Sequence, residues 1–145
     1  MCGLAALFAY GETAPPIDRE VLGQMGDQMH RRGPDSQGTW ISEDGRVGLT
    51  QRQLSILDLS ARAAQPLRSA DGQLVISYNG EIYNYRALRA SLEQKGYVFR
   101  TDSDTEVLLH LYEEQGEAMV AHLRDMFAFA VWDEGSRSLF LARDP

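Results

Sequence analysis

Cysteine is scarce in this sequence: Cys2 is the only one among 145 residues. A single cysteine excludes an internal disulfide, so a packed core must hold the fold, and a chain of this length is long enough to build one. We therefore expect one domain. Because proteins without disulfides are typical of reducing compartments, we also expect a cytoplasmic location.

Long apolar runs are absent as well. No stretch approaches the roughly 18–20 apolar residues that a transmembrane helix needs. The short apolar run at residues 4–10 also lacks the basic segment that precedes such a run in a secretory signal peptide. We expect neither a membrane span nor a membrane partner.

Basic residues are outnumbered, with 14 Lys and Arg against 21 Asp and Glu, which gives a net charge of −7. This balance disfavours nucleic acid as a partner, because binding to phosphates needs a basic surface. The three histidines, His30, His110 and His122, stand far apart and without the spacing of metal ligands, so the sequence predicts no metal site.

The one cysteine stands next to the N-terminus, between Met1 and Gly3. Removal of Met1 would join the Cys2 thiol and a free α-amine on one residue. These groups titrate near ~8.5 and ~7.7–8.0, so the amine can act as the base for the thiol. From position alone, a small buried hydrophobic residue at the start of a strand is the simpler interpretation.

Strand and helix patterns come in blocks along the chain. The expected strands cover 3–10, 37–42, 46–52, 73–78, 97–100, 126–132 and 139–142, and the expected helices cover 18–32, 84–96, a segment capped by Ser103 or Asp104, and 118–124. Asp-Gly pairs at 44–45 and 71–72 favour hairpins. Hairpins without strict βαβ alternation predict an α+β fold with antiparallel sheets.

Four short motifs follow one another along the chain: Met-Cys-Gly at 1–3, Arg-Gly-Pro-Asp at 32–35, Asn-Gly-Glu-Ile-Tyr-Asn at 79–84 and Ser-Asp-Thr-Glu-Val at 103–107. In this order the chain resembles the glutaminase domain of class II glutamine amidotransferases, nearest to the glutamine-hydrolysing asparagine synthetases. The resemblance covers essentially all of residues 1–145. It implies an N-terminal nucleophile (Ntn) hydrolase-like fold, an αββα sandwich of two antiparallel sheets.

The resemblance also implies catalytic roles. Cys2 would attack the side-chain amide of glutamine, form a γ-glutamyl thioester and release ammonia. The side-chain amide of Asn79 and the backbone N–H of Gly80 would hold the tetrahedral oxyanion. For Arg32 we expect a structural role, supporting the nucleophile region from the end of a helix.

Substrate-binding residues follow in the same way. Glu81 and Asp104 would bind the α-ammonium group of glutamine, although from pattern alone Asp104 reads as a helix cap and Glu81 as a solvated charge. Leu54, Ile56 and Leu57 would line the pocket with their backbone, in an apolar segment that is long for an idle loop.

One position departs from the family pattern: Gln53 stands where these proteins carry an arginine that binds the substrate carboxylate. Glutamine offers no cationic fork. Arg52 is adjacent, but alternation along a strand points its side chain to the other face. Gln53 therefore fits an alternative function, an amidase that acts on a substrate without a free α-carboxylate.

The chain stops directly after a strand, whereas the resemblance implies further strands and then a synthetase domain. We therefore expect a glutaminase domain that is incomplete at its C-terminus, with the synthetase domain absent. No cofactor is expected in this domain, and ATP and Mg²⁺ would belong to the synthetase domain. That domain, on the same or a separate chain, would use the ammonia to amidate a carboxylate such as aspartate. A non-catalytic scaffold with the same fold is the alternative, and a homodimer stays open.

Overall fold

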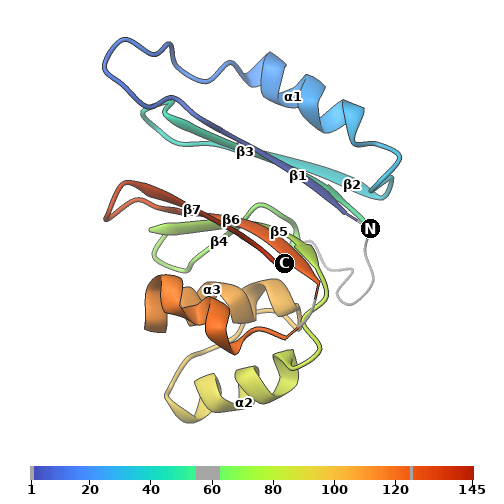
Figure 1. Cartoon of the computed structure of the whole chain (residues 1–145), viewed down its shortest axis with the longest axis vertical. Coiled ribbons are helices and arrows are strands. Elements are labelled where there is room, and N and C mark those ends of the chain that lie inside the picture. The colour runs from blue at the N-terminus through green and yellow to red at the C-terminus, as the bar shows by residue number, and fades with distance from the viewer. Residues whose placement is uncertain (1, 55–62, 125) are drawn as a thin grey trace.

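The structure is a computed structural model, and it describes residues 2–54, 63–124 and 126–145. Two antiparallel sheets stack face to face, with helices on the outer face of each (Figure 1). This is the expected α+β, αββα arrangement.

The first sheet has the order β1-β3-β2 and the second the order β4-β5-β6-β7. The strands are β1 (Gly3–Phe8), β2 (Ser36–Ile41), β3 (Val47–Gln53), β4 (Leu67–Arg68), β5 (Leu74–Gly80), β6 (Phe127–Asp133) and β7 (Ser138–Arg143). Helix α1 (Arg19–Gln28) covers the first sheet. Helices α2 (Tyr85–Gln94) and α3 (Asp104–Gln115) and the 3-10 helix η2 (Gly116–His122) lie on the side of the second.

Both predicted Asp-Gly hairpins form, and they share one turn chemistry. The Ser42 hydroxyl donates to Asp44 at 2.7 Å, and the Ser69 hydroxyl donates to Asp71 at 2.6 Å. Gly45 and Gly72 follow with φ of +68° and +74°, a conformation that glycine adopts without steric cost. These turns fix the registers of β2 with β3 and of β4 with β5.

Two predicted helix starts are confirmed in detail. Asp18 caps α1 by accepting the Glu20 N–H at 2.7 Å, and Ser103, rather than Asp104, caps α3 by accepting the Glu106 N–H at 3.4 Å. Helix α1 ends at Gln28, before the predicted residue 32.

Three further expectations about local structure were wrong. Residues 97–100 form no strand, because the N–H groups of Arg100 and Thr101 donate to the buried Glu106 carboxylate at 2.7–3.1 Å instead of to a neighbouring strand. The helix expected over 118–124 is the 3-10 helix η2. The strand expected to end at residue 78 continues as β5 to Gly80, paired with β6 throughout.

Alternation along β5 separates two hydrophobic clusters. Val75 packs between the sheets with Trp132, whereas Ile76 and Tyr78 pack toward the helices. Successive strand side chains point to opposite faces, so Asn79 faces the first sheet, on which the chain begins. This alternation directs the end of β5 toward Cys2.

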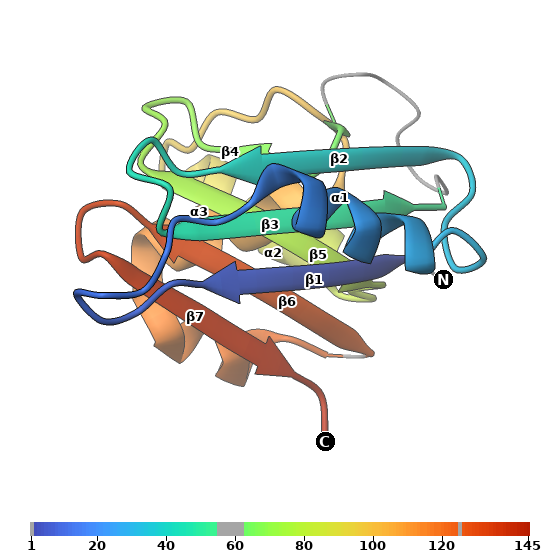
Figure 2. The same ribbon diagram turned by 90° about the horizontal axis from the view of Figure 1, so that it is seen from above.

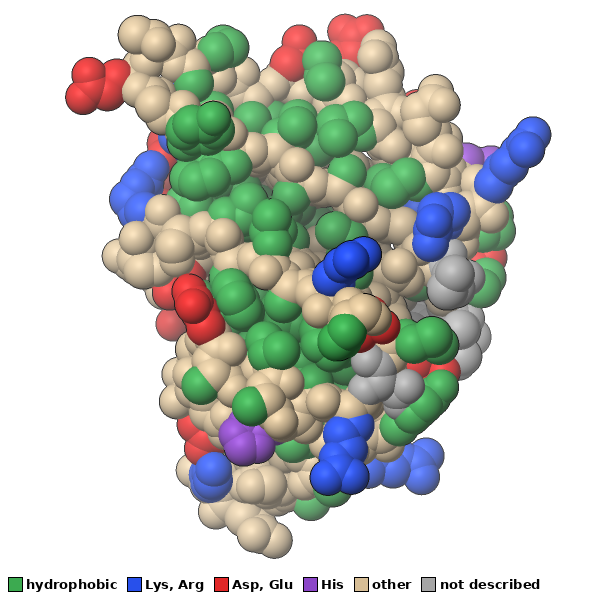
Figure 3. All heavy atoms as spheres, in the orientation of Figure 1, with side chains coloured by type: hydrophobic (Ala, Val, Ile, Leu, Met, Phe, Trp, Pro, Cys, Tyr) green, Lys and Arg blue, Asp and Glu red, His purple; other side chains and the backbone are tan. Residues whose placement is uncertain are grey.

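The edge strands β1 and β7 lie along the same flank of the sandwich (Figure 2). Hydrophobic side chains gather on the face seen in Figure 3, and the half-exposed Phe8 and Leu141 belong to these two strands. In the part of the chain that the structure describes, no helix is long and apolar enough to cross a membrane.

Candidate active site

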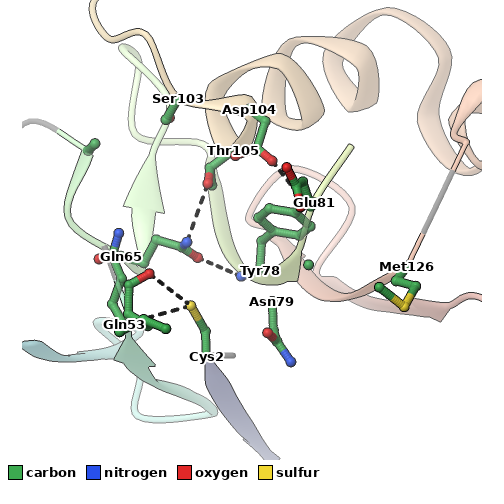
Figure 4. A pocket seen from close by; sticks show the side chains of 13 residues that line it. Cys2, Gln53, Gln65, Tyr78, Asn79, Glu81, Ser103, Asp104, Thr105 and Met126 are labelled. Atoms are coloured by element: carbon green, nitrogen blue, oxygen red, sulfur yellow. Dashed lines mark hydrogen bonds between the residues drawn. The ribbon is translucent and has the colours of Figure 1, made fainter. Parts of the chain in front are cut away.

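A cavity of about 160 Å³ opens where the ends of β1, β3 and β5 meet the start of α3. Its lining includes seven of the nine site residues that the sequence predicted: Cys2, Gln53, Leu54, Asn79, Gly80, Glu81 and Asp104. Figure 4 shows Cys2 on one side of this cavity and the two carboxylates on the other. The two remaining residues, Ile56 and Leu57, lie outside the described residues.

The thiol of Cys2 is half-buried and held by the end of β3. Its Sγ accepts the Leu54 N–H at 3.4 Å and lies 3.7 Å from the Leu54 carbonyl oxygen. The guanidinium of Arg32 donates to the Cys2 carbonyl at 3.3 Å, and the Asp35 N–H donates to the Gln53 carbonyl at 3.2 Å. The motif at 32–35 thus bonds both to the start of β1 and to the end of β3, in agreement with the structural role predicted for Arg32.

Gly80 ends β5 at a place where only glycine fits. Its φ is +154°, and a Cβ there would lie 2.3 Å from the Met126 carbonyl oxygen. Because the Glu81 N–H donates to that same oxygen at 3.1 Å, Gly80 belongs to a non-hydrogen-bonded pair with Phe127. The N–H of Gly80 therefore points away from β6, toward the side of β5 on which the cavity opens.

Asp104, at the first position of α3, is buried and bound from two sides. The hydroxyl of Tyr78 donates to its Oδ2 at 3.0 Å, and the Ile82 N–H donates to the same oxygen at 3.4 Å. Burial raises the pKa of Asp104, and these two bonds oppose the rise. A cation bound in the cavity would relieve the cost of the buried charge.

Tyr78 stays a neutral donor in this arrangement. Its burial raises the pKa of the phenol far above the ordinary value, and the carboxylate of Asp104 adds to the rise. The exposed Glu81 lies beside the Tyr78 ring, close to Asp104 (Figure 4). The two carboxylates therefore concentrate negative charge at one end of the cavity.

Arg52 does not replace the missing cation next to Gln53. Its side chain points to α1, where it donates to the Gly26 carbonyl at 3.1 Å and pairs with Asp27 at 2.9 Å. This confirms the strand-alternation argument. Among the described residues that line the cavity, two are acidic and none is lysine or arginine.

Sequence reasoning missed several residues of the cavity wall: Ala63, Gln65, Tyr78, Ser103, Thr105 and Met126. The buried Gln65 accepts the Tyr78 N–H at 2.6 Å and donates to the Thr105 hydroxyl at 3.3 Å. The sequence offers one indication of this role: Gln65 lies in the long segment after residue 54. The length of that segment suggested a function but did not single out any residue in it.

No group of three or more His, Cys, Asp or Glu side chains in residues 2–54, 63–124 and 126–145 could hold a metal ion. The described residues that line the cavity bring together a thiol, side-chain amides, backbone N–H groups and two carboxylates.

Comparison with known proteins gives a consistent result. The family described as "Glutamine amidotransferase domain" matches residues 1–145. Asparagine synthetase [glutamine-hydrolyzing] 1 of Bacillus subtilis is 45% identical, with 100% of this chain and 23% of the relative covered. Amidase chry2 of Gibberella zeae is 36% identical, with 99% and 22% covered. The chain thus spans about a quarter or less of these relatives.

Among solved structures, glutamine phosphoribosylpyrophosphate amidotransferase of Bacillus subtilis, in complex with ADP and GMP, is similar with a TM-score of 0.55 and 29% identity. The similarity covers 68% of this chain and 23% of that one. That protein shares the Ntn fold of class II amidotransferases. Family, fold and relatives agree, and the chain therefore belongs to the glutamine amidotransferase domain family, as a homologue of the glutaminase domains of glutamine-hydrolysing asparagine synthetases.

Proposed function

We propose that this domain hydrolyses the side-chain amide of glutamine with Cys2 as the nucleophile. The observation that carries the proposal is the placement of a half-buried thiol and a pair of carboxylates on opposite sides of one small cavity. Glutamine has an amide at one end and an α-ammonium group at the other. Its amide carbon would lie at Cys2 while the ammonium binds Glu81 and Asp104.

The reaction needs a base and an oxyanion site. After removal of Met1, the α-amine of Cys2 takes the thiol proton, and sulfur bonds to the amide carbon. The side-chain amide of Asn79 and the Gly80 N–H stabilise the oxyanion. The amine then returns the proton to the leaving nitrogen, the C–N bond breaks and ammonia departs. Water attacks the γ-glutamyl thioester and releases glutamate and the free thiol.

The ammonia would serve a synthetase domain that amidates a carboxylate, most simply aspartate. This part of the proposal rests on the relatives, which are glutamine-hydrolysing asparagine synthetases about four to five times longer than the region matched here. ATP and Mg²⁺ would act in that domain, whether it lies on the same or a separate chain.

The test is glutamate release from glutamine by the wild-type chain and by Cys2→Ala, with matched melting curves to confirm folding. We expect turnover in the wild type and none above background in Cys2→Ala. Equal release by both proteins would refute the proposal. A folded wild type that releases no glutamate would favour the scaffold alternative.

The charges of the cavity favour a second candidate, an amidase for substrates whose α-carboxyl group is blocked. Two acidic and no basic side chains line the cavity among the described residues, and Arg52 is paired with Asp27. A blocked carboxyl would avoid repulsion there. A panel of glutamine, its α-amide and its α-methyl ester decides between the two, because faster turnover of glutamine than of either analogue would refute this candidate.

A further inference from the structure

On the edge of β5 that faces away from β6, the pairing with β4 ends before β5 reaches the cavity. Strand β4 has two residues, Leu67 and Arg68, which pair with Ile76 and Val75. Extending this register by two residues would place Gln65 opposite Tyr78. The backbone of Gln65 forms no β-bridge there, so Tyr78 has to satisfy its N–H and carbonyl groups in another way.

Two buried glutamine side chains take the place of that strand. Gln65 Oε1 accepts the Tyr78 N–H at 2.6 Å, and Gln51 Nε2 donates to the Tyr78 carbonyl at 2.7 Å. Gln51 reaches across from β3 of the first sheet, and its own Oε1 accepts the Ser77 hydroxyl at 2.5 Å. Both backbone groups of Tyr78 are therefore fixed by side chains.

Gln65 is itself held in place from two directions. Its Nε2 donates to the Thr105 hydroxyl on α3 at 3.3 Å. Its backbone crosses β2 at Gly38, where a Cβ would lie 1.7 Å from the Gln65 carbonyl oxygen. A Cβ at position 38 would therefore force the backbones of β2 and Gln65 apart.

The next backbone donor on this edge is the proposed oxyanion donor. The N–H of Glu81 donates to Met126, next to β6, whereas the N–H of Tyr78 donates to Gln65 on the opposite edge. Because N–H directions alternate along a strand, the even-numbered residues of β5 point their N–H groups away from β6. Gly80 follows Tyr78 by two residues, so its N–H lies on the same edge. There the cavity opens, with Gln65 forming part of its wall.

We infer that Gln51 and Gln65 are positioning residues that hold the Tyr78 peptide groups and thereby aim the Gly80 N–H at the oxyanion. This inference rests on the proposed function for its catalytic consequence. Its structural part, the coupling of Gln65 to the orientation of Gly80, is independent of turnover. The two parts can therefore be tested separately.

The structural test uses amide hydrogen exchange and NMR on the full chain. Gln65→Met removes both hydrogen bonds at similar side-chain volume. Gln37→Met is the matched control, since Gln37 is an exposed residue of β2 whose side chain points to α1 and donates to the Gly23 carbonyl at 3.5 Å. We expect Gln65→Met to speed exchange at Tyr78 by about tenfold or more and to shift the Gly80 resonance. Thr105→Val should have a smaller effect, because it leaves the Gln65–Tyr78 bond in place.

The functional test measures glutamine turnover and alkylation of Cys2 by iodoacetamide, a reaction that forms no oxyanion. We expect Gln65→Met and Gln51→Met to lower kcat about tenfold or more, with KM and the alkylation rate within about twofold of wild type, since losing an oxyanion donor outright typically costs about 10²–10³ in rate. A purely structural role would lower the melting temperature and leave kcat of the folded protein unchanged.

An unchanged Tyr78 exchange rate and Gly80 resonance in Gln65→Met would overturn the inference. A kcat that falls no further than in Gln37→Met, or an equal loss of alkylation rate, would also overturn it. If the wild type releases no ammonia, the proposed function fails. The amide exchange rate of Tyr78 and the NMR resonance of Gly80 still decide whether Gln65 positions Gly80.

Discussion

The hydroxyl of Tyr78 donates a hydrogen bond of 3.0 Å to Oδ2 of Asp104, and both residues are buried. The bond joins the strand that carries the proposed oxyanion donors to the helix that carries a proposed substrate-binding carboxylate. Burial raises the pKa of Asp104, and the hydrogen bond from Tyr78 opposes this rise because it favours the ionised carboxylate. Folding stability therefore favours the neutral form of Asp104, whereas the proposed binding of an ammonium group favours the ionised form.

Asp104→Asn should stabilise the folded chain at neutral pH. Burial raises the folded-state pKa of Asp104, so its contribution to stability is present at pH values below the unfolded-state pKa and is lost as the pH rises through the raised folded-state pKa. Asparagine removes the buried charge. We expect a higher melting temperature than wild type at pH 7 and a smaller difference at pH 4.

The same substitution should weaken glutamine binding. Loss of a charge-assisted hydrogen bond to the α-ammonium, about 1.5–3 kcal/mol, corresponds to a KM that is about 10- to 100-fold higher. Asp102→Asn, a change at an exposed neighbouring aspartate, is the control for both measurements. A lower melting temperature at pH 7 or an unchanged KM would contradict the role assigned to Asp104.

Gln53→Arg should lower the KM for glutamine by about 10- to 100-fold with a smaller effect on kcat, because the guanidinium would bind the α-carboxylate in ground state and transition state alike. Steady-state kinetics at fixed ionic strength measure this. Gln37→Arg adds the same charge on β2, outside the cavity lining, and should leave KM unchanged. An unaltered KM in Gln53→Arg would mean that another group already binds the carboxylate.

Gly80→Ala should lower kcat by about 10²–10³ and destabilise the fold by about 1–3 kcal/mol, because the added Cβ pushes β5 away from β6 at Met126. Gly96→Ala is the matched control, since Gly96 also has a positive φ, +96°, but open space around its Cβ position. Denaturant unfolding and turnover of both variants separate the effect of backbone strain on stability from the effect of a displaced Gly80 N–H on catalysis. Equal kcat in the two variants would argue against Gly80 as an oxyanion donor.

Local chemistry predicted most of the elements. The Asp-Gly turns, the caps at Asp18 and Ser103 and the direction of Arg52 follow from contacts within a few residues or from the two-residue period of a strand. The false strand at 97–100 shows the limit of this reasoning, because its backbone donors bind Glu106, a side chain from the next helix. A pattern of apolar residues contains no information about such a partner.

The candidate site residues were chosen by resemblance to the family and not from residue pattern. Glu81 and Asp104 read as a solvated charge and a helix cap on pattern alone, and the motif order led to their placement in one cavity with Cys2. Gln65 and Gln51 could not be predicted from either source. Their hydrogen bonds to Tyr78 depend on how the two sheets stack and on the close crossing at Gly38, which are tertiary features.

The most direct test of the central claim is the intact mass of the purified protein before and after reaction with 6-diazo-5-oxo-L-norleucine, a glutamine analogue that alkylates nucleophiles of this kind. We predict a protein that lacks Met1 and gains one adduct, located on Cys2 by peptide mapping and prevented by excess glutamine. A folded protein that gains no adduct, or gains one that glutamine does not prevent, would contradict the claim that Cys2 acts on glutamine.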